Sequence, residues 1–205
     1  MDNRTKILQA AITVFAENGK EGARVDKIAA LSGLNKAMIY YYFTSKDLLF
    51  EEVLSRILID VFQEIEEQTF KALSQTEDPV ELLRIVVRTL FESFASREHY
   101  ATLINSTLAK HSDMVRRVLV KELTSRDSKI ATLMHHILNM GKPNNIFREI
   151  DIQQLEINLV GMTLIYYIAK PIAEALLLEE VDEEGFLERR IDSTIDLLLY
   201  GILRR

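Results

Sequence analysis

The chain has 205 residues, 48% of them hydrophobic, so it is long enough to bury a sizeable core in one or two domains. It has no cysteine, which excludes a disulfide scaffold and cysteine-ligated metal sites, and its net charge of −6 argues against nucleic-acid binding over the whole surface. The N-terminus is too charged for a signal peptide, and no apolar run approaches the roughly eighteen residues of a membrane helix. We therefore expect a cytoplasmic protein without a membrane segment.

Helices are predicted over nearly the whole chain, because apolar residues recur at intervals of three and four and only seven glycines and three prolines interrupt them. In the first part of the chain we expect helices at residues 4–17, 25–32, 36–42 and 45–73. A left-handed glycine in "ENGKEG" should end the first helix, and the Ser45 hydroxyl should cap the fourth.

The second part of the chain continues the helical pattern. We expect helices at residues 78–95, 97–110, 112–140, 151–178 and 183–203, which makes about nine in all. Asp78 and Asp151 stand at N-cap positions, and Pro171 should kink the helix that contains it because it lacks an amide donor. The predicted fold class is all-α.

The spacing of residues 25–43 is that of a helix-turn-helix. Ile28 and Leu31 are expected to give the first short helix its buried side, and Gly33 follows where a tight turn needs a positive φ. Asn35 then caps the second short helix. Ile39 and Phe43, four residues apart, should bury the inner face of this helix.

The outer face of the second short helix is suited to DNA. Its residues are Lys36, Ala37, Met38, Tyr40 and Tyr41, with Tyr42 toward one edge. A recognition helix inserts its N-terminal residues into the major groove, where lysine donates to guanine or phosphate and small side chains let the backbone approach. Tyrosine hydroxyls donate to phosphate oxygens. The alternative is that the three tyrosines belong to the core, but consecutive helical residues point about 100° apart, so not all three face inward.

Charge is distributed in agreement with this interpretation. Residues 1–47 carry seven Lys or Arg and five Asp or Glu, a net of +2, which leaves −8 for the rest of the chain. A basic N-terminal part on an acidic body is typical of a separate module that binds a polyanion.

Residues 4–50 resemble the DNA-binding domain of the tetracycline-repressor (TetR) family of bacterial transcriptional regulators. The resemblance is carried by "ILQAAITVFAENG", "IAALSGLNKAMIYYYF" and "SKDLL". It implies a DNA-binding domain at residues 1–50, with its helix-turn-helix at about 24–43, and a helical domain for effector binding and dimerisation at 51–205.

The resemblance also implies roles for single residues. Lys36 and Ala37 would approach bases, and Tyr40, Tyr41 and Lys46 would contact phosphates, with Tyr42 near the backbone. The family often has threonine at the position of Val25, and Arg24 or Lys27 would replace its phosphate contact. The predicted DNA-binding residues are Arg24, Lys27, Asn35, Lys36, Ala37, Met38, Tyr40, Tyr41, Tyr42 and Lys46.

Two helices of the body carry apolar stripes that could pair with a second copy into a four-helix interface, as the family implies. The predicted interface residues are Leu155, Leu159, Leu187, Ile191, Ile195, Leu198 and Ile202. The alternative is that these stripes face the core of their own chain.

A small-molecule effector is the other partner that the resemblance implies, bound among the middle helices. Polar or soft side chains within apolar helices are the predicted lining, because pockets are mostly apolar with a few polar groups. They are Tyr100, Asn105, His111, Met134, His135, Asn158, Met162 and Tyr166.

No catalytic or metal motif is visible. His135 and His136 are adjacent and diverge on a helix, unlike a zinc-binding pair four residues apart. We therefore expect no enzyme, no cofactor and no metal. The predicted function is a homodimeric repressor that binds a palindromic operator and is released by a small molecule. A helical protein-interaction module that keeps its helix-turn-helix without operator specificity is the alternative.

Overall fold

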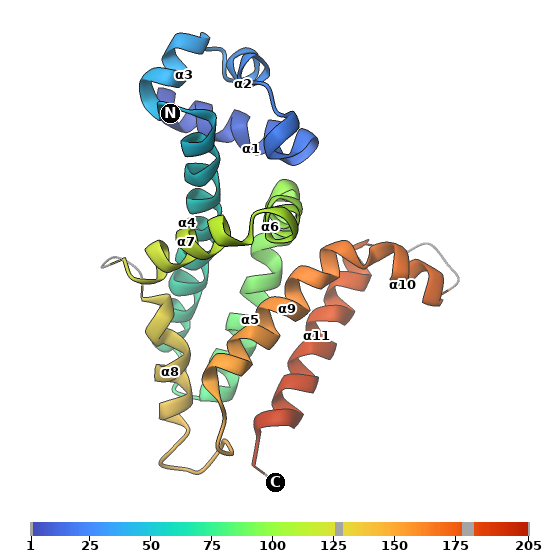
Figure 1. The fold of residues 1–205 in the computed structure, drawn as a ribbon. Coiled ribbons are helices and arrows are strands. Elements are labelled where there is room, and N and C mark those ends of the chain that lie inside the picture. Colours follow the sequence, from blue (N-terminus) through green and yellow to red (C-terminus); the bar gives the residue numbers. More distant parts are fainter. Residues whose placement is uncertain (1, 126–128, 178–182, 205) are drawn as a thin grey trace. The chain divides into compact units, whose positions relative to one another are not determined.

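The computed structural model describes residues 2–125, 129–177 and 183–204, and it shows an all-α protein (Figure 1). The described residues form eleven α-helices. The predicted fold class is therefore confirmed, and the two helices beyond the predicted number come from predicted helices that the structure divides.

The helices belong to two compact units, which are described here separately. One unit comprises Met1–Asp60 and Arg97–Ser125, and the other comprises Val61–Ser96 and Arg126–Arg205. Helix α4 (Lys46–Leu73) contributes its first half to the first unit and its second half to the other. The first compact unit thus contains α6 (Glu98–Lys110) and α7 (Ser112–Leu123) together with the N-terminal helices. The domain boundary expected at residue 50 stays a prediction.

The first unit begins with α1 (Asn3–Gly22), α2 (Val25–Ser32) and α3 (Lys36–Phe43). Asp2 caps α1 by accepting a hydrogen bond of 2.7 Å from the Thr5 amide. The expected end of this helix at residue 17 is wrong, because helical backbone resumes after Gly19. Gly19 itself has φ +66°, so the left-handed glycine predicted in "ENGKEG" is present as a kink inside α1.

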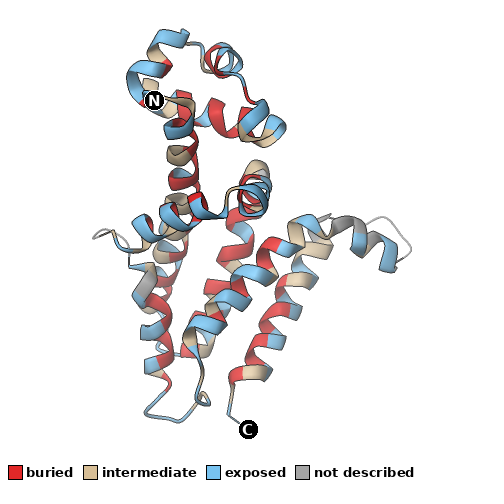
Figure 2. Ribbon diagram, viewed as in Figure 1, coloured by how far each residue is buried: buried red, intermediate tan, exposed pale blue. Residues whose placement is uncertain are grey.

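Aromatic and aliphatic side chains of α1 and α4 form the core beneath α2 and α3. Phe15 and Phe50 meet edge to face with ring centroids 4.7 Å apart, an arrangement that aromatic quadrupoles favour. Ile28 of α2 and Ile39 of α3 are buried as well. Figure 2 shows buried stretches along α1 and α2. Each such side chain contributes about 1.5–3 kcal/mol by leaving water. Leu31 was expected on the buried side, but it is 57% exposed.

Helices α6 (Glu98–Lys110) and α7 (Ser112–Leu123) complete the first unit, and α6 packs on α1. The Tyr100 hydroxyl of α6 donates to Asp60 of α4 at 2.5 Å. Burial and this carboxylate raise the pKa of Tyr100, so the phenol stays protonated and can act as the donor. The Ser55 hydroxyl of α4 donates to Glu122 of α7. These bonds tie α6 and α7 to α4.

The second unit is built around α5 (Pro79–Ala95), whose apolar side chains Leu82, Leu83, Val87 and Phe91 are fully buried. The unit also contains α8 (Ile130–Met140), α9 (Ile152–Ile168), α10 (Lys170–Leu177) and α11 (Glu183–Ile202). Of these, α8, α9 and α11 pack on α5 (Figure 1).

Two predicted helices are divided in the structure. The helix expected at 112–140 is α7 and α8, with α7 ending at Leu123 and α8 beginning at Ile130. The helix expected at 151–178 breaks at Ala169 into α9 and α10, and residue 178 lies outside the described residues. Pro171 accounts for this break, because it cannot donate to the carbonyl four residues earlier.

Gly33 provides the first prediction. Its φ is +69°, a conformation that costs an L-residue about 1–2 kcal/mol. We expect Gly33→Ala to lower the free energy of unfolding by about 1 kcal/mol in urea denaturation. Gly22→Ala is the matched control, because Gly22 lies in the last turn of α1 and a Cβ there meets only ordinary contact at 3.6 Å. Equal losses from both substitutions would contradict the assigned role of Gly33.

Candidate nucleic-acid interface

The turn between α2 and α3 sets the direction of α3. Gly33 occupies the left-handed region, and the Leu34 amide donates back to Ala29 at 3.1 Å, as in a helix-terminating turn. The Asn35 side chain then accepts from the Met38 amide at 2.9 Å. The predicted turn glycine and N-cap are both confirmed, and α3 therefore begins at Lys36.

Helix α3 has one buried face and one exposed face. Ile39 and Phe43 are buried as predicted, whereas Tyr40, Tyr41 and Tyr42 are 42%, 79% and 37% exposed. The alternative that all three tyrosines belong to the core is therefore wrong. The Tyr41 and Tyr42 rings contact each other edge to face at 5.2 Å between centroids, so the aromatic run is partly preorganised.

Lysines near this surface are held by acceptors within the first unit. The Lys36 ammonium lies 3.1 Å from Asp26, and that of Lys27 lies 2.7 Å from Glu17. The hydrogen bond from Lys27 holds the pKa of the Glu17 carboxyl below its ordinary value. These carboxylate partners were not predicted from the sequence, because ten residues separate the members of each pair.

Lys46 has a structural contact that the sequence did not indicate. Its ammonium donates to the backbone carbonyls of Glu21 and Ala23 at 3.1 and 3.2 Å, at the end of α1. A cation is favoured there by the carbonyl end of the helix. Since an ammonium has three donors, one remains for a phosphate. The Ser45 hydroxyl accepts from the Leu48 amide, as predicted for the cap of α4.

Arg24 and Val25 start α2 without a side-chain cap. Arg24 stands at the N-cap position and makes no capping hydrogen bond, while Val25 is buried in the core. The amide end of α2 therefore lacks a side-chain acceptor, and helix N-termini of this kind bind phosphate readily. Arg24 is exposed beside it.

The predicted effector residues are distributed over both compact units. Tyr100, Asn105 and His111 belong to the first unit, and the other five belong to the second. In the second unit, Tyr166 stacks on Phe186 and meets Phe91 edge to face, with centroids 5.8 and 6.1 Å away. His135 and Asn158 are exposed. The lining assigned to these eight residues stays a prediction.

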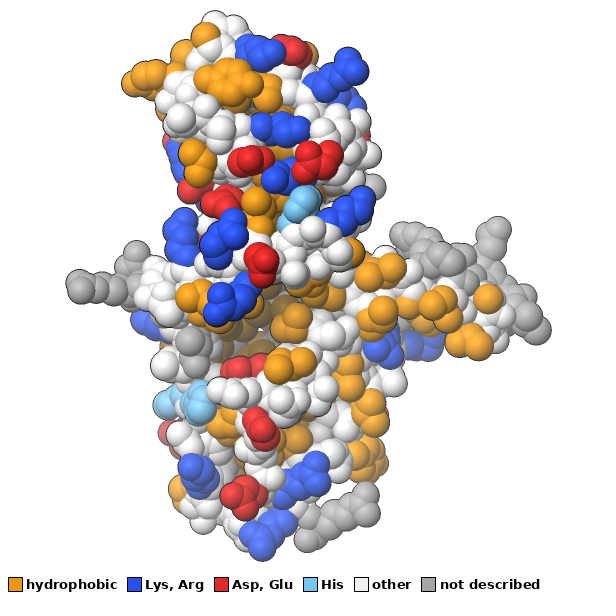
Figure 3. Space-filling model, in the orientation of Figure 1, with side chains coloured by type: hydrophobic (Ala, Val, Ile, Leu, Met, Phe, Trp, Pro, Cys, Tyr) orange, Lys and Arg blue, Asp and Glu red, His pale blue; other side chains and the backbone are white. Residues whose placement is uncertain are grey.

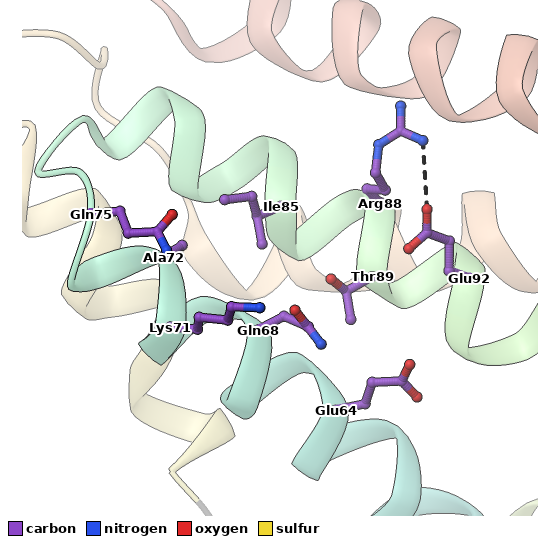
Figure 4. Close-up of a pocket in the computed structure, with 9 residues that line it drawn as sticks. All are labelled: Glu64, Gln68, Lys71, Ala72, Gln75, Ile85, Arg88, Thr89 and Glu92. Atoms are coloured by element: carbon purple, nitrogen blue, oxygen red, sulfur yellow. Dashed lines mark ion pairs between the residues drawn. The ribbon is translucent and has the colours of Figure 1, made fainter.

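A polar groove lies between the second half of α4 and α5, within the second unit (Figure 4). Its volume is about 370 Å³. Gln68 and Lys71 of α4 face Thr89 of α5, whereas Arg88 points toward Glu92 and α11. Its lining residues are Glu64, Gln68, Lys71, Ala72, Gln75, Ile85, Arg88, Thr89 and Glu92, and none was predicted from the sequence.

The predicted dimer residues face the core of their own chain. Leu155, Leu159, Ile191, Ile195, Leu198 and Ile202 are all buried within the single chain, and Leu187 is half-buried. The assignment of these seven residues to a dimer interface stays a prediction. The inner stripes of α9 and α11 were selected from the sequence because their apolar residues recur every 3.6 residues. A stripe that faces the core and a stripe that faces a partner show the same period.

A second apolar stripe on these helices is exposed. Ile157, Ile165 and Ile168 of α9 and Leu197 and Tyr200 of α11 are 50–75% exposed. Figure 3 shows apolar side chains along α9 and α11 on the face that it presents. The spacing of Ile157, Ile165 and Ile168 is also helical, but the sequence did not single out this face because apolar residues occur on more than one side of α9.

These features define a helix-turn-helix protein with a helical body, and two family models match it. Residues 7–53 match the bacterial regulatory proteins of the tetR family, and residues 79–198 match the tetracyclin repressor-like C-terminal domain. The chain belongs to the TetR family of DNA-binding transcriptional regulators.

Related proteins agree with this assignment. The transcriptional repressor NicS of Pseudomonas putida is 28% identical over 146 residues, which are 71% of this chain and 66% of NicS. The transcriptional regulator RutR of Escherichia coli K12 is 25% identical over 199 residues, 97% of this chain and 90% of RutR. These relatives are transcriptional regulators and not enzymes.

Solved structures share the fold. The fatty acid degradation regulator FadR of Bacillus halodurans superposes with a TM-score of 0.72 at 22% identity, covering 96% of this chain and 98% of FadR. The ketosteroid transcriptional regulator KstR2 of Mycobacterium tuberculosis gives a TM-score of 0.65 at 17% identity, covering 100% of this chain and 96% of KstR2.

Among the described residues, none of the helices combines the length and the hydrophobicity that a membrane-spanning segment needs.

The contact of Lys46 with α1 leads to the second prediction. We expect Lys46→Met to lower the free energy of unfolding by about 1 kcal/mol, because two backbone carbonyls lose a charged donor. Lys6→Met, at an exposed position of α1, should change it by less than about 0.5 kcal/mol. Urea denaturation followed by circular dichroism measures both. If Lys46→Met leaves the free energy of unfolding unchanged, the contact adds nothing to stability.

Proposed function

We propose that the protein is a homodimeric repressor that binds a palindromic operator with α3 in the major groove. The observation that supports this most directly is the two-sided character of α3. Ile39 and Phe43 anchor the helix, while its N-terminal residues and its tyrosines face solvent. A recognition helix needs this arrangement, because it reads bases with one face and is held by the other.

Phosphate and base contacts are assigned to different residues of the interface. Lys36, Ala37 and Met38 lie in the first turn of α3 and would approach base edges. Arg24, Lys27, Lys46 and the tyrosine hydroxyls would contact the sugar-phosphate backbone, which fixes register without reading sequence.

Two copies are needed because one recognition helix reads too few base pairs for specificity in a genome. The exposed apolar side chains of α9 and α11 are a suitable interface, since a partner helix would bury them. Gly161 stands within it, and a Cβ there would meet nothing within 4 Å in its own chain. A glycine inside a helix costs about 1 kcal/mol relative to alanine, so close approach of a partner helix is a reason for its presence.

Release of the operator by a small molecule is the remaining part of the proposal. An effector acts only if it binds one arrangement of the DNA-binding helices better than another. The groove between α4 and α5 is one place where it could bind, because α4 continues without a break from Lys46 through this groove.

The third prediction concerns the dimer. We expect Ile157→Glu combined with Leu197→Glu to raise the dimer Kd at least about a hundredfold, because two charges would be buried in an apolar interface. Sedimentation equilibrium at micromolar concentration should give twice the 23.6 kDa chain mass for the wild type and one chain mass for the variant. Val120→Glu, at a 50% exposed position of α7, is the control and should remain dimeric. A monomeric wild type would exclude the proposed dimer.

The fourth prediction concerns phosphate contacts. We expect Tyr40→Phe and Tyr41→Phe each to weaken binding to all duplexes about a hundredfold, because the dimer loses two hydrogen bonds to charged oxygens, one in each protomer and each worth about 1.4 kcal/mol. Tyr200→Phe removes the same hydroxyl from an exposed tyrosine of α11 and should leave affinity unchanged. Fluorescence anisotropy with operator and scrambled duplexes measures this. Unchanged affinity in both α3 variants would remove the tyrosines from the interface.

In vitro selection from a random duplex library tests the proposed function as a whole. At about 150 mM salt, nonspecific phosphate binding is weak, so only sequence-specific complexes are enriched. We expect an inverted repeat whose half-sites are one helical turn apart, about 34–36 Å. Failure to enrich any sequence would favour a helix-turn-helix that no longer reads an operator.

A further inference from the structure

An exposed aspartate lies beside the residue that begins the recognition helix. Both carboxylate oxygens of Asp26, in the first turn of α2, are 3.1 Å from the ammonium of Lys36. The side chains are 71% and 50% exposed. Ion pairs of this kind contribute about 0–1 kcal/mol, and an acid in the first turn of a helix contributes about 0.3–1 kcal/mol through the helix dipole, so Asp26 adds only modestly to the stability of the fold.

A carboxylate at a DNA-binding surface is unfavourable by itself. It repels phosphates and cancels one of the positive charges that drive association. Such a residue is compatible with tight binding when it accepts a hydrogen bond from a base. The major groove offers this donor on cytosine N4, for which aspartate and glutamate are the usual partners, and lysine is a usual partner of guanine O6 and N7.

The geometry of the pair matches a G·C base pair. Guanine O6 and cytosine N4 are hydrogen-bonded to each other, about 2.9 Å apart, and their outer edges present an acceptor and a donor side by side. Lys36 and Asp26 present the complementary donor and acceptor 3.1 Å apart. The ammonium can then face O6 while the carboxylate faces the free N4 hydrogen, and their own ion pair is kept.

We propose that Asp26 is a specificity-determining residue that reads one G·C base pair of each half-site together with Lys36. Lys36 donates to guanine O6 or N7, and Asp26 accepts from cytosine N4. This inference rests on the proposed function, since it places α3 in the major groove.

A second acid–lysine pair of the same unit provides the matched control. Glu17 of α1 and Lys27 of α2 are 2.7 Å apart and about half exposed, but neither residue belongs to α3. Removing Glu17 frees a lysine for phosphate without touching a base-reading position. Glu17→Ala should therefore strengthen binding to all sequences and steepen the salt dependence by up to about 1.8 in log Kd per log salt, because the dimer gains two free lysines.

The test compares selections with the wild type, Asp26→Ala and Glu17→Ala, followed by Kd values at about 150 mM salt. We expect the wild type to prefer a G·C pair at one symmetric position over A·T by roughly tenfold. Asp26→Ala should reduce this preference to about threefold or less and leave the other operator positions unchanged. Glu17→Ala should keep the full preference.

The possible outcomes separate this inference from the proposed function. If the wild type selects an operator and Asp26→Ala selects it with an unchanged preference at every position, Asp26 does not read a base, while the proposed function stands. If Asp26→Ala strengthens binding equally to all sequences, as is expected for Glu17→Ala, then Asp26 likewise does not read a base and the proposed function stands. If the wild type selects nothing, the proposed function fails, and the inference fails with it. Thermal unfolding checks that the exposed substitutions leave the fold intact.

Discussion

The proposed DNA-binding surface depends on the burial of Ile39 and Phe43 on the inner face of α3. A helix of eight residues has little stability of its own in water, so α3 exists because its inner face packs on the core of the first unit. Phe15 and Phe50 form much of that core. Once the inner face is buried, helical geometry alone decides which side chains point outward. The exposure of Lys36 and the tyrosines is therefore a consequence of packing.

Polar contacts then refine what packing establishes. Gly33 and Asn35 set where α3 begins, and Lys46 fastens the start of α4 to the end of α1. Asp26 and Glu17 hold the two lysines that would otherwise extend freely into solvent. When the cations of a DNA-binding surface are partly neutralised, nonspecific binding to phosphates is weaker. Base contacts then contribute a larger share of the affinity.

The body of the protein illustrates a limit of periodicity. Helices α9 and α11 satisfy one apolar pattern against their own core and a second on their exposed faces. Periodicity reports that a face is buried, but it does not say whether the partner is the same chain or another one. The inner stripe was assigned to the dimer for this reason. Only the burial of Leu155 and Ile191 within the chain separates the two faces.

The sequence by itself determined the helical fold, the turn at Gly33 and the two faces of α3. It also determined the caps at Asn35, Ser45, Asp78 and Asp151, whose side chains accept from the Met38, Leu48, Val80 and Gln154 amides. These features depend on residues at most a few turns apart, where local geometry leaves little choice. Only the tertiary structure decided that α6 and α7 join the N-terminal helices, that Lys36 meets Asp26, and which stripe of α9 remains exposed. Such contacts join distant residues, and many pairings satisfy the same pattern until the chain packs.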